Sequence, residues 1–147
     1  MNLRSATVED LTAVEELLAS NDLPRDGVRE NFADFVVAED RGSIVGAIGL
    51  ELFDSAALLR SAVVSSDQRG TGIGRCLVEE ILTRAEAAGI EEVYLLTTTA
   101  EDYFPRFGFT RVSRAAVPVA LRSSAEFQGA CPETAVVMTR RTTKASK

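Results

Sequence analysis

Residues 65–89 read "SSDQRGTGIGRCLVEEILTRAEAAG", and glycine occupies every second position from Gly70 to Gly74. An amphipathic helical pattern follows directly. Glycines at such a junction allow successive backbone N–H groups to converge on an anion, and the dipole of the following helix favours a phosphate there. Arg69 and Arg75 flank the glycines in a chain that is otherwise acidic. The stretch therefore predicts an anion-binding loop, with a tight turn that binds no ligand as the alternative.

Two well-known nucleotide motifs do not fit this spacing. A P-loop ends in Gly-Lys-Ser/Thr, whereas Gly74 is followed by Arg75 and Cys76. The dinucleotide fingerprint is G-x-G-x-x-G; counted from Gly70 the third glycine falls one position early, and counted from Gly72 it is missing. The loop is therefore predicted to hold a phosphate group of some other ligand.

The apolar patterns around the loop predict a mixture of strands and helices. Strands are expected at the N-terminus and at residues 34–40, 43–53, 56–64, 91–99, 110–114 and 133–140. Helices are expected after Thr7, at 28–32, from about 73 to Gly89 and at 100–108. The chain at 115–128 is expected to be irregular with one helical turn. The fold class is thus α/β or α+β around a mixed sheet, as one domain over residues 1–140 followed by a tail at 141–147.

Composition excludes several classes of function. A chain of 147 residues with a net charge of −6 lacks the basic surplus that nucleic-acid binding needs. It has no histidine and two distant cysteines, so neither a zinc site nor a Ser/His or Cys/His nucleophile pair is expected. No stretch approaches the ~20 apolar residues of a membrane span, and no leader-like segment opens the chain. We expect a cytoplasmic protein that binds no metal, nucleic acid or membrane.

Two quoted stretches resemble a known superfamily. "VVSSDQRGTGIGRCLVEEIL" (63–82) resembles the acetyl-CoA pyrophosphate loop of the GCN5-related N-acetyltransferases (GNAT), whose Gln/Arg-x-x-Gly-x-Gly/Ala pattern is matched by Arg69, Gly72 and Gly74. "YLLTTTAEDYFPRFGF" (94–109) resembles the later strand and "YxxxGF" helix of that superfamily. The resemblance implies a central mixed sheet of about six to seven strands, flanked by helices and splayed at an acetyl-CoA slot.

The resemblance also implies which residues hold acetyl-CoA. A bulge in the strand at 56–64 is expected to open the slot. Its last residues would pair the pantetheine like an added strand, and backbone amides of the loop would surround the pyrophosphate. The residues implied for acetyl-CoA binding are Ala62, Val63, Val64, Arg69, Gly70, Thr71, Gly72, Ile73, Gly74 and Arg75.

Acetyl transfer to an amine needs a base, an oxyanion donor and an acid. Glu51 and Glu101 are the candidate bases, with a solvated surface carboxylate as the alternative for each. A backbone N–H near the end of the strand at 56–64 would stabilise the oxyanion, as the resemblance implies. For the acid, Phe104 stands where the superfamily places its tyrosine, and Tyr103 lies one position earlier. Tyr103 is therefore either the acid or a core aromatic. In the second case a water or a threonine hydroxyl serves as the acid, or the thiolate leaves unassisted.

The arginines and threonines near the slot are candidates for binding the acceptor. Arg60 interrupts an apolar strand, and a guanidinium there suits a carboxylate, phosphinate or arsenate-like group. Arg114 and Arg122 are further candidates. The alternative pairs these arginines with internal partners such as Glu126, or leaves Arg114 and Arg122 on the surface. Thr97 and Thr98 are further candidates, and the alternative for the run 97–99 is a stretch that favours a strand, with Thr99 as a helix cap. Cys131 is interpreted as a small buried hydrophobe.

Three C-terminal stretches show a closer resemblance. "ALLRSAVV", "YLLTTTAEDYF" and "RAAVPVALRSSAEFQGACPETAVVM" are similar to the arsenic-resistance-associated N-acetyltransferases of the ArsN type. This implies an enzyme of detoxification that acetylates the amine of a small, anionic, amino-acid-like arsenical or phosphinic antimetabolite. Transfer would occur directly within a ternary complex, and a homodimer is a further expectation. Acetylation of a protein or peptide amine and a non-catalytic acyl-CoA sensor are the alternatives.

Overall fold

The computed structural model describes residues 1–98, 100–130 and 134–142. Its strands are β1 (Asn2–Ser5), β2 (Phe35–Asp40), β3 (Ser43–Phe53), β4 (Ala56–Val64), β5 (Glu92–Thr97), β6 (Thr110–Val112) and β7 (Val136–Arg141). The α-helices are α1 (Leu11–Ser20) and α2 (Ile73–Ala87). Short 3-10 helices are η1 (Val8–Asp10), η2 (Phe32–Asp34), η3 (Ser66–Gln68), η4 (Phe104–Phe107), η5 (Arg114–Ala116) and η6 (Val119–Ser123), and η7 (Glu126–Ala130) is a π-helical turn.

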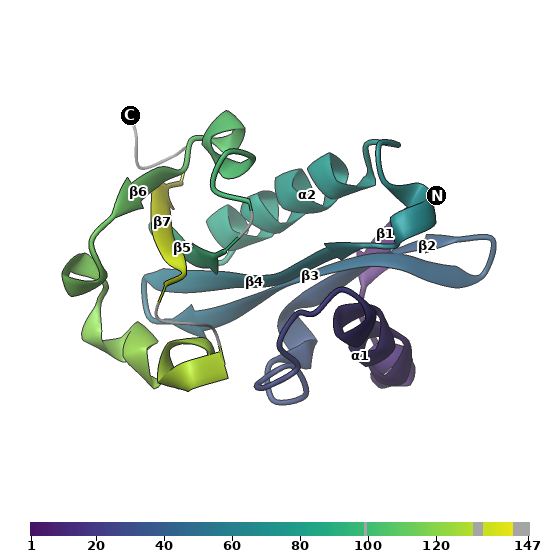
Figure 1. The fold of residues 1–147 in the computed structure, drawn as a ribbon, viewed down its shortest axis with the longest axis horizontal. Coiled ribbons are helices and arrows are strands. Elements are labelled where there is room, and N and C mark those ends of the chain that lie inside the picture. Colours follow the sequence, from purple (N-terminus) through teal and green to yellow (C-terminus); the bar gives the residue numbers. More distant parts are fainter. Residues whose placement is uncertain (99, 131–133, 143–147) are drawn as a thin grey trace.

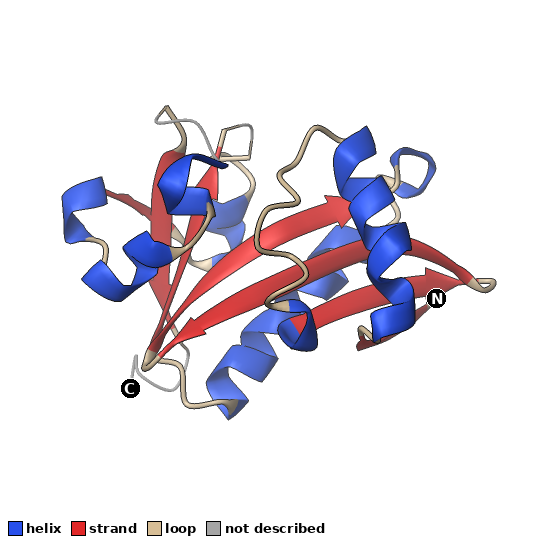
Figure 2. Cartoon of the chain, turned by 90° about the horizontal axis from the view of Figure 1, so that it is seen from below, coloured by secondary structure: helices blue, strands red, loops and turns tan. Residues whose placement is uncertain are grey.

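The strands form one open mixed sheet in the order β1-β2-β3-β4-β5-β7-β6. Neighbouring strands are antiparallel except for β4 and β5, which are parallel and joined by the crossover through α2. Helix α2 covers one face of the sheet and α1 covers the other (Figures 1 and 2). The predicted α+β fold around a mixed sheet is confirmed.

Each face of the sheet has its own apolar core. Under α2, the helical stripe that contains Leu77 and Ile81 packs against β3, β4 and β5. On the opposite face, Val14 and Leu18 of α1 pack with Phe35. In a third cluster, the short helices that follow β6 pack against the strands β4, β5 and β7. The sheet is therefore held from both sides, which makes it a rigid support for whatever lies at its edges.

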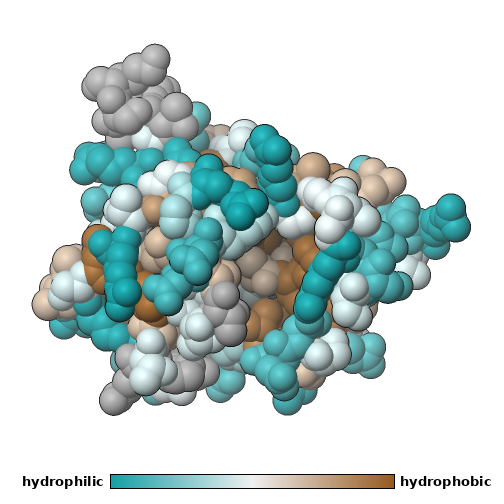
Figure 3. Space-filling model, turned by 45° about the horizontal axis from the view of Figure 1, so that its top comes forward, coloured by the Kyte–Doolittle hydropathy of each residue, from teal (hydrophilic) through white to brown (hydrophobic). Residues whose placement is uncertain are grey.

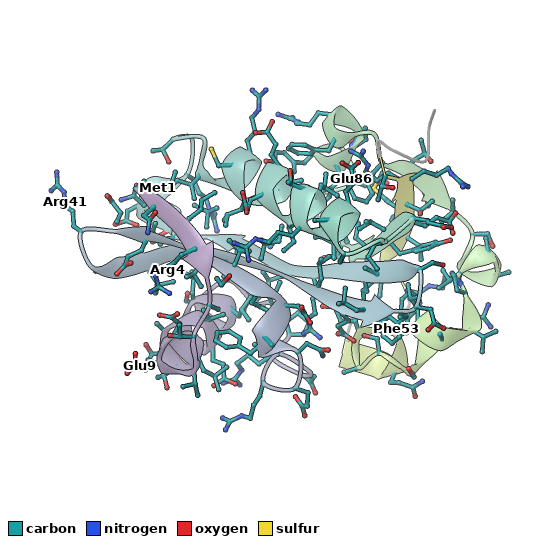
Figure 4. The ribbon with its side chains drawn as sticks, turned by 180° about the vertical axis from the view of Figure 1, so that it is seen from behind. Met1, Arg4, Glu9, Arg41, Phe53 and Glu86 are labelled. Carbon is teal, nitrogen blue, oxygen red and sulfur yellow. The ribbon has the colours of Figure 1, made fainter. Side chains whose placement is uncertain are left out.

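The β2–β3 hairpin confirms the turn predicted at residues 40–42. Arg41 and Gly42 both have positive φ, 52° and 80°, as a two-residue turn between antiparallel strands requires. Arg41 lies at the tip of this hairpin, and Phe53 lies at the opposite end of β3 (Figure 4). The long strand β3 therefore runs well beyond its pairing with β2, which ends at Gly49.

Strands β4 and β5 separate part of the way along. Their pairing runs from Ala56 and Glu92 to Leu59 and Leu95 and then stops. On the other side of β4, the register with β3 shifts at a bulge, where Ser61 has a left-handed φ of 59°. A bulge bends its strand and increases the local twist, so β4 turns away from β5 beyond Leu59. This is the splay that the resemblance implied.

Two predicted helices differ from the structure. Residues 28–32 were expected to be helical, but they form turns that lead into η2, because Gly27 is left-handed and the Asn31 side chain bonds its carbonyl. The helix expected at 100–108 is a turn followed by η4, where Pro105 near the start suits a tight turn and Gly108 closes it with a φ of 89°. Strand β7 continues to Arg141, and residues 143–147 of the predicted tail lie outside the described residues.

Gly49 is required by a close approach of Phe35. A Cβ at position 49 would lie 2.2 Å from the Phe35 ring. We expect Gly49→Ala to lower the free energy of unfolding by about 1–3 kcal/mol, because the ring must leave its rotamer in a packed core. Urea unfolding followed by circular dichroism measures this change. Ser43→Ala, at an exposed position of the same strand, is the matched control, and an unchanged midpoint in Gly49→Ala would contradict the expectation.

Candidate active site

A cavity of about 1000 Å³ lies where β4 and β5 separate. Its walls are formed by the 21–26 loop, β4, the glycine loop, the start of α2, the end of β5 and η4. Figure 3 shows a hollow with hydrophobic residues inside it and hydrophilic side chains around it. Among the residues predicted for the site, the lining includes Arg60, residues 62–64, Arg69, Gly70, residues 72–75, Thr97, Thr98 and Tyr103. Most of the predicted acetyl-CoA residues are therefore brought together.

The glycine loop has the geometry of an anion cradle. Gly70 and Gly72 have φ values of 83° and 89°, which residues with a Cβ rarely adopt. A Cβ at either position would meet nothing within 4 Å, so these glycines are needed for backbone conformation and not for lack of space. Gly72 is the N-cap of α2, whose first amides have no partner within the helix. Thr71 does not line the cavity; its hydroxyl donates to the Gln68 carbonyl at 2.5 Å and braces the loop.

Three exposed arginines surround this end of the cavity. Arg69 bonds the Asn21 side chain across the opening, and Arg75 forms an ion pair with Glu79 at 3.2 Å. Arg106 stacks over the Tyr103 ring, with its guanidinium carbon 4.6 Å from the ring centroid. All three line the cavity. Positive side chains beside a helix N-terminus favour a ligand with negatively charged phosphates.

Tyr103 points its hydroxyl toward the start of α2. A Cβ at Gly74 would lie 3.4 Å from this oxygen, and within the described residues no hydrogen bond occupies it. Burial raises the pKa of Tyr103, so the phenol remains protonated at neutral pH. Phe104 is instead buried, and its ring packs edge-on against Phe109 at 5.7 Å. The one-residue shift in the sequence therefore leaves the tyrosine, and not the phenylalanine, with a polar group in the cavity.

Arg60 is buried and held by several acceptors. Its side chain is 0% exposed, and Nη1 donates to Glu51 Oε2 at 2.6 Å. Nη2 donates to the Asp26 carbonyl at 2.5 Å, and Nε donates to the Ser61 hydroxyl at 3.1 Å. Gly27 permits this packing, since a Cβ there would lie 2.7 Å from Arg60 Nη1. Arg60 lines the cavity but is bound by internal partners, which was the alternative interpretation of its sequence position.

Glu126 lines the cavity, which its position in the sequence did not indicate. It enters the wall from η7, and its side chain is 5% exposed. Its Oε2 lies 3.7 Å from Arg60 Nη2. Burial raises the pKa of Glu126 to about 7; Arg60 opposes this rise and Glu51 adds to it. Glu126 lies in an irregular, serine-rich stretch, where no helical or strand periodicity predicts that a side chain is buried. The sequence therefore suggested it only as a partner for an arginine.

Four further candidates lie outside the cavity lining. Glu51 is buried behind Arg60 and accepts a hydrogen bond from the Ser124 hydroxyl at 3.1 Å. Glu101 is exposed and faces Arg111 at 3.5 Å. Arg114 donates to the Ala135 carbonyl, and Arg122 donates to carbonyls of residues 114, 115 and 117, so both tie the C-terminal loops together.

Two of the three candidate threonines, Thr97 and Thr98, belong to the described residues. Thr97 is buried, and its hydroxyl accepts a hydrogen bond from the Ala100 amide at 2.9 Å. Thr98 is exposed on the cavity wall. Thr99 and Cys131 lie outside the described residues.

Two classes of site are not found in the described part of the chain. Residues 1–98, 100–130 and 134–142 contain no group of three or more metal-ligating side chains that could hold an ion. Over the same residues, no helix is long and apolar enough to cross a bilayer.

The split sheet, its crossover helix and the glycine loop are together the features of the GNAT fold. Residues 31–111, more than half of the chain, match the family model described as acetyltransferase (GNAT) domain. The chain belongs to this family of acetyltransferases.

Comparisons with individual proteins agree with the family. An amino-acid acetyltransferase of Ralstonia nicotianae is 29% identical over 120 residues, covering 76% of this chain and 27% of that protein. An uncharacterised N-acetyltransferase of Chlorobaculum tepidum is 29% identical over 118 residues, covering 78% of this chain and 76% of that protein. The structure of N-acetylglutamate synthase from Neisseria gonorrhoeae, complexed with coenzyme A and N-acetyl-glutamate, superposes with a TM-score of 0.83 at 21% identity, over 96% of this chain and 35% of that chain. This chain thus spans only about a quarter of the length of the Ralstonia relative.

Proposed function

We propose that this protein transfers the acetyl group of acetyl-CoA to the amine of a small, amino-acid-like acceptor, by direct attack within a ternary complex. The observation that carries the proposal is the glycine loop at the α2 N-terminus, opening onto the cavity between β4 and β5. Membership of the acetyltransferase family supports the reaction class. The names of the relatives, and the coenzyme A complex of the gonococcal enzyme, support the donor and the acceptor class.

The cavity residues fit acetyl-CoA. Left-handed Gly70 and Gly72 leave open space above the backbone for a pyrophosphate, and Arg69, Arg75 and Arg106 supply positive charge. Residues 62–64 of β4 lie beyond the end of its pairing with β5, so backbone groups on that edge are available to a pantetheine chain. When bound, acetyl-CoA would supply an activated acetyl thioester.

Different groups of the chain itself would carry out the separate steps of the transfer. A backbone N–H of Val63 or Val64 would stabilise the oxyanion as the amine attacks. Tyr103 would give a proton to the departing thiolate, because its hydroxyl lies at the start of α2 and is protonated at neutral pH. The apolar residues of the cavity wall would shield a bound thioester from water.

The proposal also concerns the chemical class of the acceptor. The amino-acid acetyltransferase relatives favour an amino acid, and arsenical or phosphinic amino-acid analogues remain in the proposed class through the resemblance of the C-terminal stretches. A peptide amine is the second candidate, because the carboxylates of Asp22, Asp26 and Glu126 all belong to cavity-lining residues and favour a basic acceptor.

Two measurements test the proposed function. Calorimetry should show saturable binding of acetyl-CoA, and its absence would overturn the assignment. A thiol-release assay should then show turnover with L-glutamate, phosphinothricin, arsinothricin or a short peptide. Turnover with the peptide alone would replace the amino-acid acceptor by a peptide amine, and binding without turnover of any amine would indicate a sensor.

Gly72→Val tests the loop directly. A β-branched residue at a φ of 89° is strained by about 1–2 kcal/mol, so the loop should leave its cradle conformation and acetyl-CoA affinity should fall roughly 5- to 30-fold. Gly89→Val is the matched control, because Gly89 has a φ of 83°, equally open surroundings and a position at the far end of α2. Equal affinities for the two folded variants would contradict the loop assignment.

A further inference from the structure

The cluster around Arg60 carries more negative than positive charge. Arg60 faces two carboxylates, Glu51 at 2.6 Å and Glu126 at 3.7 Å, and all three side chains are at most 5% exposed. One arginine cannot balance two ionised carboxylates, so the cluster holds one unbalanced negative charge when both are ionised. A buried charge of this kind is costly unless a counter-charge arrives or a proton is taken up.

The two carboxylates differ in how they are satisfied. Glu51 accepts hydrogen bonds from Arg60 and from Ser124 and does not line the cavity. No described hydrogen bond reaches the Glu126 carboxylate, whose backbone N–H alone is bonded, to Ser124. Within the described residues no side-chain oxygen is both inaccessible and without a hydrogen bond. Because Glu126 lines the cavity, the accessible part of its carboxylate faces the cavity.

Glu126 lies at the end of the cavity opposite the glycine loop. Along β4 the order is Arg60, then residues 62–64, then the loop that begins after Val64. At ~3.3 Å per residue, Arg60 and Val64 are about 13 Å apart along the strand. A cofactor whose pyrophosphate lies on the loop and whose pantetheine follows residues 62–64 therefore presents its thioester toward Arg60 and Glu126. Asp22 and Asp26 line the same cavity and add carboxylates to its wall.

We propose that Glu126 is the group that receives the acceptor: its carboxylate binds the acceptor's ammonium group and takes the proton that must leave before the amine can attack. This inference rests on the proposed acetyl transfer. It makes Glu126 a catalytic residue, and it defines the acceptor as an amine that arrives protonated. Arg60 and Glu51 are positioning residues, since Arg60 holds Glu126 against the wall and Glu51 holds Arg60.

Each proton released during the transfer has an acceptor. The ammonium gives one proton to Glu126, and the free amine forms the C–N bond while the C–S bond breaks. The thiolate takes the Tyr103 proton, and the second proton lost from nitrogen as the amide forms restores Tyr103. The proton on Glu126 leaves to solvent. The raised pKa of Glu126, about 7, suits a group that must accept and release a proton near neutral pH.

Glu126→Gln is the deciding variant, with Glu30→Gln, an exposed change outside the cavity, as its matched control. With the amine from the panel that turns over fastest, kcat/KM at pH 7 should fall roughly 10²- to 10⁴-fold in Glu126→Gln. The acid limb of the wild-type pH profile, near pH 7, should disappear. Glu126→Asp should recover part of the rate. A wild-type rate and an unchanged acid limb in folded Glu126→Gln would overturn the proposal.

A second measurement does not depend on turnover. In protein carrying ¹³C-labelled glutamate side chains, one carboxyl resonance absent from Glu126→Gln should titrate near pH 7. Methylammonium should lower that titration midpoint saturably, whereas methanol at the same concentration should not, because a cation favours the ionised carboxylate. A midpoint that methylammonium leaves unchanged would overturn amine binding at Glu126. Failure of acetyl-CoA to bind would instead overturn the proposed function, so the two failures are distinguishable.

Discussion

Tyr103→Phe should lower kcat by roughly 10²- to 10⁴-fold, which is the contribution of a positioned general acid. The phenylalanine ring retains the edge-on contacts with Phe104 and Phe107, so the fold and the cavity shape should persist. Acetyl-CoA affinity should change little, because only the hydroxyl at the start of α2 is removed. Steady-state kinetics and calorimetry on the same preparation separate the two effects.

Tyr94→Phe is the control for this prediction. The chain has two tyrosines, and Tyr94 lies in β5 with its hydroxyl bonded to Glu92 at 3.4 Å, outside the cavity lining. The wild-type alkaline limb of kcat should lie above the ordinary pKa of a tyrosine, since burial raises the pKa of Tyr103. Tyr94→Phe should keep that limb. If Tyr103→Phe retained most of the wild-type kcat, water or a threonine hydroxyl would replace Tyr103 as the acid.

Arg60→Leu should lower the free energy of unfolding by about 3–5 kcal/mol, the usual effect of removing one partner from a buried ion pair. The leucine leaves Glu51 and Glu126 buried together with no positive charge between them. It also removes the hydrogen bonds to the Asp26 carbonyl and the Ser61 hydroxyl. Urea unfolding measures the loss, and Arg69→Leu, at an exposed arginine of the same cavity, should have a small effect.

The pH dependence of this variant distinguishes charge burial from lost packing. Arg60 lowers the pKa of Glu126, so its removal should raise that pKa further above the unfolded value of 4.5. A group whose folded pKa is raised stabilises the fold below its unfolded pKa, and this contribution is lost as pH rises through the folded value. Arg60→Leu should therefore be less destabilised at pH 5 than at pH 8. Adding Glu51→Gln and Glu126→Gln should recover stability, and a pH-independent loss that they do not relieve would indicate packing instead.

Much of the fold could be predicted because its signals are local. Alternating and helical spacing located the β2–β3 hairpin, β4, α2 and β5 to within a few residues. Where predictions failed, side chains competed with regular backbone bonding, as Asn31 does after Gly27. The C-terminal stretch at 115–128 was expected to be irregular with one helical turn. It lies within three short helical turns, η5, η6 and η7, which pack by contacts that the periodicity of the sequence does not show.

The candidate site likewise has one part that local sequence predicts and one part that depends on distant segments. The sequence by itself determined the glycine loop, because positive φ at Gly70 and Gly72 and the helix that follows are properties of about twenty consecutive residues. Only the tertiary structure decided what Arg60 does, since its partners come from the 21–26 loop, β3 and η7, and Ser124 bonds Glu51 across 73 residues of chain. Burial and charge pairing depend on segments that are distant in sequence. The proposed phosphate-binding loop could therefore be predicted from the chain, whereas the proposed acceptor end of the cavity could not.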